Sequence, residues 1–160
     1  MIQAITETNI GVYIQTEDNR INTSVASTQI RHLIKFTNDL DKSVHYAYPL
    51  AETILDRYTV LIYTYNATPN MYSGQLNLLP AGYWKYEVYE VSWIGTVTVS
   101  SGNAPATEND VLTPAADDKG VVQGLVTKGK MYVAEKDGTE QVQYTQRQEP
   151  SGTNYIYYGQ

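Results

Sequence analysis

The chain has 160 residues, a formal net charge of −6 and no cysteine, which suits one ordinary domain and excludes disulfides, thiolate nucleophiles and cysteine-bound metals. An acidic chain without a cluster of lysine and arginine repels a phosphate backbone, so we expect no direct nucleic-acid partner. No apolar run approaches the roughly 20 residues that cross a bilayer, and the N-terminus lacks a secretory signal, so we expect synthesis in the cytoplasm and no membrane contact.

An apolar period of two runs from about residue 28 to residue 95, which predicts short β-strands. The first strand is IRHLIKFTN, and a turn at residues 38–42 separates it from a second strand that Pro49 ends. The residues expected on one face of these two strands are Ile30, His32, Ile34 and Phe36, then Val44, Tyr46 and Tyr48. The alternation places these side chains on a half-buried sheet.

The run RYTVLIYTYN differs from these strands because both of its faces are apolar. Tyr58, Val60 and Ile62 share one face, and Leu61 and Tyr63 lie on the other. Strands that are apolar on both faces are typical of the covered centre of a fold. We therefore expect a central strand that is covered on both sides.

Both tryptophans lie in GQLNLLPAGYWKYEVYEVSW, residues 74–93. A break at residues 79–82 separates a short strand from a longer one, because proline fixes φ and glycine relieves the exit from a turn. The apolar set changes from Trp84 and Val88 to Val91 and Trp93 along the longer strand. This change of phase predicts a bulge near Val88–Tyr89, or a strand that leaves one sheet to pack on another.

The remaining segments complete the prediction of an all-β fold, an antiparallel β-sandwich. We expect an extended N-terminal arm over 1–28, the β-sandwich core over 29–95 and a long polar loop over 96–120. Residues 121–160 are expected to form a C-terminal β-hairpin extension, turning at Asp137-Gly138, and a strand that packs on the core or on a neighbouring subunit. A long polar loop is typically functional or ordered by a neighbour.

No segment carries a convincing catalytic or cofactor motif. GLVTKGK, residues 124–130, has the glycine and lysine spacing of a phosphate-binding loop, but Met131 follows where a hydroxyl is needed and a hairpin follows where a helix is needed. We interpret its glycines as turn residues. His32 and His45 lack a partner ligand and are expected to be structural.

The carboxylate pairs Asp39/Asp41, Glu87/Glu90 and Asp117/Asp118 carry no signature of their own. Asp39 and Asp41 resemble the start of a calcium loop only faintly, because the sixth-position glycine and closing glutamate are missing. A glycosidase pair depends on separation in space, which sequence does not give. We expect no enzyme, no cofactor and no metal.

Fifteen tyrosines are the most distinctive feature of the composition. Tyrosine suits half-buried sheet faces, protein interfaces, where aromatic side chains are enriched and charge is depleted, and platforms that stack on sugars. Packing accounts for many of them, and both of the other roles stay open. The interface candidates are Tyr13, Tyr89, Trp93, Tyr155, Tyr157 and Tyr158.

The pattern Leu78, Pro80, Gly82, Trp84 and Tyr86 resembles the corner between strands E and F of immunoglobulin-like and fibronectin type III sandwiches. A leucine, a proline or glycine turn and an aromatic residue lock the crossing between sheets there. Trp84 stands at the position that the corner tyrosine usually occupies. The resemblance covers about 60 residues. It implies an immunoglobulin-like antiparallel β-sandwich in which these five side chains have a structural role.

A broader resemblance covers most of residues 30–160. The segments LIKFTNDLDKSVHYAYP, RYTVLIYTYN and GQLNLLPAGYWKYEVYEV, with the tyrosine-rich ending, are similar to small virion structural proteins of tailed double-stranded DNA bacteriophages, including marine and crAss-like ones. The resemblance implies a non-enzymatic virion protein, either a capsid decoration protein or a neck or tail ring subunit. Its partners would be the major capsid protein or portal and tail ring proteins, and further copies of itself. We expect it to bind these neighbouring subunits through its arms and its tyrosine-rich surfaces. A carbohydrate- or receptor-binding β module remains the alternative.

Overall fold

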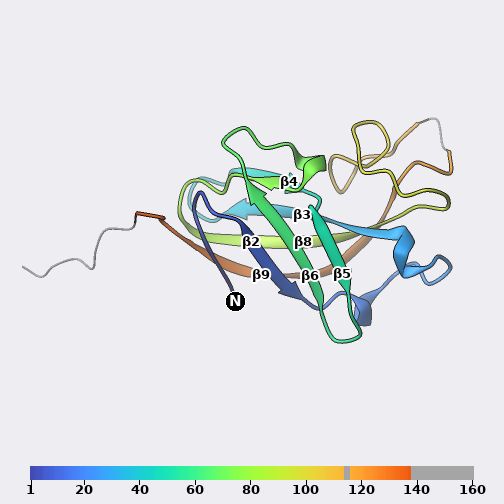
Figure 1. Ribbon diagram of the computed structural model, residues 1–160, viewed down its shortest axis with the longest axis horizontal. Coiled ribbons are helices and arrows are strands. Elements are labelled where there is room, and N and C mark those ends of the chain that lie inside the picture. Colours follow the sequence, from blue (N-terminus) through green and yellow to red (C-terminus); the bar gives the residue numbers. More distant parts are fainter. Residues whose placement is uncertain (114–115, 138–160) are drawn as a thin grey trace, which may run out of the picture.

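The computed structural model describes residues 1–113 and 116–137, which form two β-sheets (Figure 1). The five-stranded sheet has the order β1 (Ile2–Ile5), β9 (Val121–Ala134), β8 (Gly82–Ser92), β3 (Ile30–Asn38) and β4 (Val44–Ala47). The four-stranded sheet has the order β2 (Ile10–Ile14), β6 (Thr59–Tyr65) and β5 (Ala51–Ile54), with β7 (Gln75–Leu76) also paired to β6. The 3-10 helices are η1 (Glu17–Asn19), η2 (Ser27–Gln29) and η3 (Met71–Ser73). The all-β prediction is confirmed.

Most strand pairs are antiparallel, but β1 runs parallel to β9 and β7 runs parallel to β6. The sheets are therefore mixed, where we expected antiparallel pairing throughout. The predicted strand at residues 30–38 is confirmed, and its expected face is buried at Ile30, His32, Ile34 and Phe36. In the part of the chain that the structure describes, no helix has the length and apolar character needed to cross a membrane.

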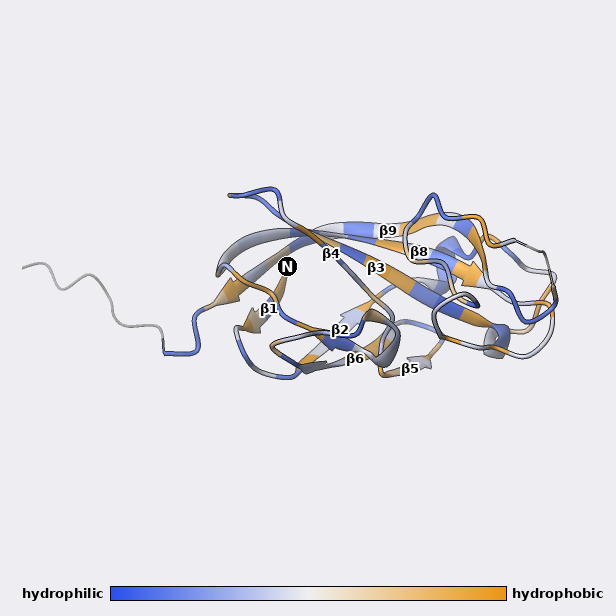
Figure 2. Cartoon of the chain, turned by 90° about the horizontal axis from the view of Figure 1, so that it is seen from above, coloured by the Kyte–Doolittle hydropathy of each residue, from blue (hydrophilic) through white to orange (hydrophobic). Residues whose placement is uncertain are grey.

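The two sheets face each other across the main apolar core (Figure 2). Alternate residues of each strand point into this layer, as the period of two requires. The inward-facing core residues include Val12 and Ile14 from β2, Leu61 and Tyr63 from β6, Ile34 and Phe36 from β3, Trp84 and Val88 from β8, and Met131 and Val133 from β9. Burial of these side chains holds the sheets together, at about 25 cal/mol for each Å² removed from water.

A second cluster explains the change of phase in β8. Strand β8 pairs with β3 without interruption, so its alternation is regular on that side. Val91 and Trp93 face the outer side of the five-stranded sheet, where residues 97–104 cover them. Ala104 of this segment is buried in the same cluster. The register does shift between Val88 and Tyr89, as predicted, but against β9, which carries the extra residue. The apolar residues change face because a loop covers the other side of the sheet.

Of the two expectations for the loop at residues 96–120, a functional role or order supplied by a neighbour, the second is corrected for the described part of the loop. The Trp93 indole nitrogen donates a hydrogen bond to the Asp118 carbonyl at 3.1 Å. The Lys119 ammonium donates to Asn103, and the Gly120 amide donates to the Asn103 carbonyl. These contacts fold the described part of the loop onto its own sheet.

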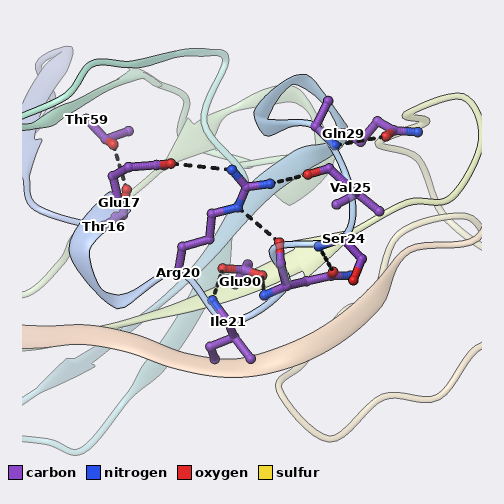
Figure 3. A network of polar contacts seen from close by, with 11 residues as sticks. Thr16, Glu17, Arg20, Ile21, Ser24, Val25, Gln29, Thr59 and Glu90 are labelled. Carbon is purple, nitrogen blue, oxygen red and sulfur yellow. Dashed lines mark hydrogen bonds and ion pairs between the residues drawn. The ribbon is translucent and has the colours of Figure 1, made fainter.

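The expected N-terminal arm is also corrected, because Ile2–Ile5 and Ile10–Ile14 are strands of the two sheets. Residues 15–29 then cross from one sheet to the other (Figure 3). The buried Glu90 carboxylate accepts hydrogen bonds from the backbone amides of Ile21 and Asn22, both at 2.8 Å. Arg20 donates to the Asn22 carbonyl at 3.0 Å and also to the Val25 carbonyl. Polar side chains thus fix a segment whose own sequence shows no strand period.

The C-terminal part of the described chain also differs from the expected extension. Strand β9 lies between β1 and β8, so residues 121–134 belong to the main sheet. Gly124 and Gly129 lie within this strand and are not turn residues; Gly129 leaves room for the Tyr86 ring, whose hydroxyl oxygen would lie 2.5 Å from an added Cβ. The predicted turn at Asp137-Gly138 and the tyrosines Tyr155, Tyr157 and Tyr158 lie outside the described residues.

Candidate interaction surface

The outer side of the four-stranded sheet presents two rows of three residues across β5, β6 and β2. One row joins Ala51, Ile62 and Gly11, and the next joins Thr53, Val60 and Tyr13, because these residues are register partners. Their strand neighbours point inward and belong to the core, so these six side chains point outward. We call these six residues the bare face.

The bare face is uncharged and partly aromatic. Tyr13 is 67% exposed, and its ring lies 5.9 Å from the Tyr58 ring at an interplanar angle of 53°. Ile62 is 37% exposed, and Val60 lies beside it on the same strand. Isolated exposed apolar residues are ordinary, but a contiguous uncharged group on a sheet marks a contact surface.

The prediction that the strand at residues 59–65 is covered on both sides is half correct. Strand β6 is central, since β2 and β5 flank it. Leu61 and Tyr63 are fully buried, whereas on the opposite side Ile62 is exposed and Val60 is half-buried. The sequence has the pattern of a strand with two covered faces, and the fold covers one.

The outer side of the five-stranded sheet shows how a solvated face of the same molecule is built. Beyond the loop cluster, Lys85 and Lys130 stand opposite each other as register partners. Asp39 lies 3.5 Å from the Lys85 ammonium and 3.8 Å from that of Lys130, which offsets their repulsion. Tyr83 and Tyr132 form a tilted pair next to them, with ring centroids 5.1 Å apart. Among the described residues, charged side chains therefore stand on the outer face of the five-stranded sheet, whereas the six residues of the bare face are uncharged.

A polar clamp fastens the loop to the five-stranded sheet. The Lys35 ammonium donates to Glu108 at 2.5 Å, and the Tyr46 hydroxyl donates to the other oxygen of the same carboxylate at 2.5 Å. Burial alone would raise the pKa of Glu108, but these two hydrogen bonds outweigh it and lower the pKa. Burial and the hydrogen bond to Glu108 raise the pKa of Tyr46 to about 12.

Both histidines have structural surroundings. The His32 side chain is buried between the sheets and pairs with Glu52 on β5, each side chain being 3% exposed. The buried Tyr63 hydroxyl has no hydrogen-bond partner among the described residues, and burial raises the pKa of Tyr63 well above its usual value. His45 lies beside Trp84 with ring centroids 5.6 Å apart, and burial lowers the pKa of His45. No nucleophile joins these groups in the described chain.

The carboxylate pairs are separated by the fold. Glu90 is buried among backbone amides, whereas Glu87 lies 3.9 Å from Lys35 on the outer face. The Asp41 carboxylate accepts hydrogen bonds from the backbone amide and hydroxyl of Ser43, and these hydrogen bonds lower the pKa of Asp41. Asp39 and Asp41 therefore serve a turn and a lysine pair. Within residues 1–113 and 116–137, no three acidic or histidine side chains gather as a metal site would require.

The predicted corner is present as a local arrangement. The Trp84 indole nitrogen donates to the Pro80 carbonyl at 3.1 Å, and the Asn38 side chain donates to the same oxygen at 3.1 Å. Leu78 is buried in the core, and Gly82 adopts a positive φ of 129° as the chain enters β8. Tyr86 packs partly buried against the same core. The Trp84 indole thus bonds back to the backbone four residues before it.

Comparison with protein-family models, with curated proteins and with solved structures found no match to this chain.

The predicted interface residues have different environments. Tyr13 is the most exposed of the described aromatic side chains and lies on the bare face. Trp93 is fully buried under the loop of its own chain, so it offers no surface to a partner, and Tyr89 packs half-buried beside it. Sequence reasoning did not single out Val60, Ile62 and Gly11. The signal for Val60 and Ile62 is visible in the sequence, since both faces of β6 are apolar. We had interpreted both faces as covered, so these two residues were not named as surface candidates.

Proposed function

We propose that this chain is a non-enzymatic structural protein that assembles with other proteins through the bare face. The observation that carries the proposal is an exposed, uncharged sheet face on a molecule whose net charge is −6. Interface centres are depleted of charge and enriched in tyrosine. The proposal does not depend on flexible arms, because Ile2–Ile14 and the described part of the loop pack on their own domain.

We propose that the setting is the virion of a tailed bacteriophage, with the chain made in the host cytoplasm. The sequence resemblance over residues 30–160 supports this setting. The first candidate role is a capsid decoration protein, and a neck or tail ring subunit is the alternative. In each role a small β domain contributes binding surface and no chemistry, and repeated weak contacts add up in a symmetric particle.

We also propose that the two sheets are a variant of the immunoglobulin-like sandwich. In such a domain the order B-E-D forms one sheet, and a G-F-C sheet extended by C′ forms the other. The order β2-β6-β5 matches the first, and β9-β8-β3-β4 matches the second, with β1 added beside β9. The corner between β6 and β8, where Trp84 bonds to Pro80, lies where that fold joins strand E to strand F.

A carbohydrate-binding module is favoured less by the same surfaces. Sugar platforms need flat, coplanar aromatic rings, but the exposed pair Tyr13–Tyr58 is tilted by 53° and the pair Tyr83–Tyr132 by 56°. Trp84 and Trp93 are both fully buried. A glycan array with the purified chain tests this alternative, and we expect no binding.

The direct test is co-expression with the major capsid protein and the portal and tail ring proteins encoded beside the chain. Assembled particles are purified on a density gradient. We expect the chain to co-sediment with them in a fixed ratio, and a Val60→Lys variant to remain at the top of the gradient. The matched control is Val44→Lys, since Val44 is an exposed aliphatic residue of β4, on the other sheet. Wild-type chain that stays unbound in every combination contradicts the proposal.

A further inference from the structure

We propose that the bare face binds the bare face of a second copy of this chain, related by a two-fold axis. This inference rests on the proposed assembly function and names one of its partners. It starts from the outer positions of strand β6, which have the apolar character of a covered strand. In the described chain Ile62 is nevertheless exposed and Val60 is only half-buried. The apolar face of a second protein would cover the outer side of β6, as its sequence pattern predicts.

The lack of charge favours a second copy as the occupant. Two copies that each carry a net charge of −6 repel each other. They approach at least cost where the touching surfaces hold no charged side chain, and the six residues of the bare face are all uncharged. The outer side of the five-stranded sheet would instead set Lys85 and Lys130 of one copy against those of the next.

The relief of the bare face is self-complementary about one axis. The Tyr13 side chain projects from the β2 end of one row. At the β2 end of the other row Gly11 has no side chain, which leaves a depression in the surface. A two-fold axis that lies between the rows and crosses the strands exchanges the two rows. It places Tyr13 of one copy over Gly11 of the other, and Val60 over Ile62. Stacked sheets lie about 10 Å apart, which such large-to-small pairs fill.

The other two-fold axis parallel to the sheet runs along the strands and fits less well. It would set Gly11 of one copy against Ala51 of the other, leaving a void between two small residues. In the other row, Tyr13 of one copy would lie against Thr53 of the other copy. Voids forfeit the contacts that stabilise a packed layer, so the geometry points to the axis that crosses the strands.

The resulting contact is small. Three strands spaced about 4.8 Å apart make a face too narrow for the roughly 1,200 Å² that stable complexes bury. We expect a dissociation constant on the order of 0.1–1 mM, which is weak in dilute solution. Such a contact becomes effective when a particle holds many copies close together.

Sedimentation equilibrium up to about 1 mM chain measures this association. Ile62→Lys, which places an ammonium in the centre of the contact, is expected to weaken it at least tenfold, and Val44→Lys on the other sheet is expected to leave it unchanged. The variant Gly11→Leu distinguishes shape complementarity from non-specific association of apolar surfaces. It adds apolar area, and a Cβ at Gly11 meets only the Ile62 methyl at 3.8 Å, so the fold accepts it. We expect Gly11→Leu to weaken association because it blocks the partner's tyrosine.

Isotope-filtered NOE spectra of mixed labelled and unlabelled chain test the axis. We expect intermolecular cross-peaks between the methyls of Val60 and Ile62 and between the Tyr13 ring and Gly11. A monomer at 1 mM, or tighter association of Gly11→Leu, overturns the inference. If a monomeric chain still co-sediments with particles, the inference fails and the proposed function stands. If the chain dimerises but never joins particles, the inference stands and the proposed function fails.

Discussion

Glu108 shows how a single carboxylate holds the long loop on the sheet. Its two oxygens accept from Lys35 and Tyr46, which stand on neighbouring strands. These hydrogen bonds lower the pKa of Glu108 in the folded protein below its unfolded value of 4.5. Such a group contributes stability that is present above pH 4.5 and is lost as the pH falls through the folded pKa.

The first prediction follows from that linkage. Glu108→Gln should lower the free energy of unfolding by about 1–2 kcal/mol at pH 7, because a charge-assisted bond at a partly buried site becomes a neutral one. The difference from wild type should shrink as the pH falls below about 4.5. Urea unfolding at a series of pH values measures both effects. The exposed Glu135→Gln is the control, and a difference for Glu108→Gln that persists unchanged at pH 3 would contradict the assignment.

The second residue-scale prediction concerns the buried pair of His32 and Glu52 between the sheets. Removing one partner leaves the other buried without compensation, so Glu52→Ala should cost about 3–5 kcal/mol. Glu52→Gln keeps an acceptor for the histidine and should cost about 1–2 kcal/mol. Equal unfolding midpoints in urea for the two variants would show that the pair itself contributes little.

At the scale of elements, β2 is a strand of the smaller sheet and not part of an extended arm. Its residues pair with Thr59–Tyr63 of β6, and Val12 and Ile14 contribute to the core. The third prediction is that the amides of β2 that bond to β6 exchange with deuterium as slowly as those of β6 in the isolated monomer. The exposed turn at residues 56–57 serves as the fast-exchanging reference, because its amides have no acceptor in the described chain. Rapid exchange over Ile10–Ile14 would restore the extended arm.

The sequence predicted elements where one pattern decides the structure, and failed where tertiary contacts decide it. Strand β3 alternates cleanly over nine residues, and the break at Pro80 was recognisable from turn chemistry. Residues 15–29 have no period, and the Glu90 carboxylate that fixes them lies about 70 residues away in the chain. The covering of Trp93 by a loop of small polar residues likewise depends on contacts between distant segments.

The candidate surface was predictable only in part, for a related reason. Tyr13 was named as an interface candidate because tyrosine is enriched at protein interfaces. Val60 and Ile62 were assigned to a covered face, because an apolar run alone does not tell whether its cover comes from the same chain. Gly11 contributes through the absence of a side chain, which has a meaning only beside the projecting Tyr13.

For the whole molecule, charge and apolar area act on association in opposite directions. Two copies repel through their net charge of −6, and this repulsion reaches about 10 Å at 0.1 M salt. The uncharged bare face gains nothing from opposite charges, and salt does not weaken apolar contact. Contact of Lys85 and Lys130 on the other sheet with acidic groups of a second copy would instead depend on ion pairs, which salt screens.

The fourth prediction uses this difference. Raising sodium chloride from 50 to 500 mM should strengthen self-association by about two- to fivefold, because screening removes repulsion between the acidic copies. Sedimentation equilibrium at matched chain concentrations measures the change, with Ile62→Lys as the variant that should lose it. If association weakens with salt, and Lys85→Gln weakens it further at low salt, the copies meet through the charged sheet and the bare face is left for a different protein.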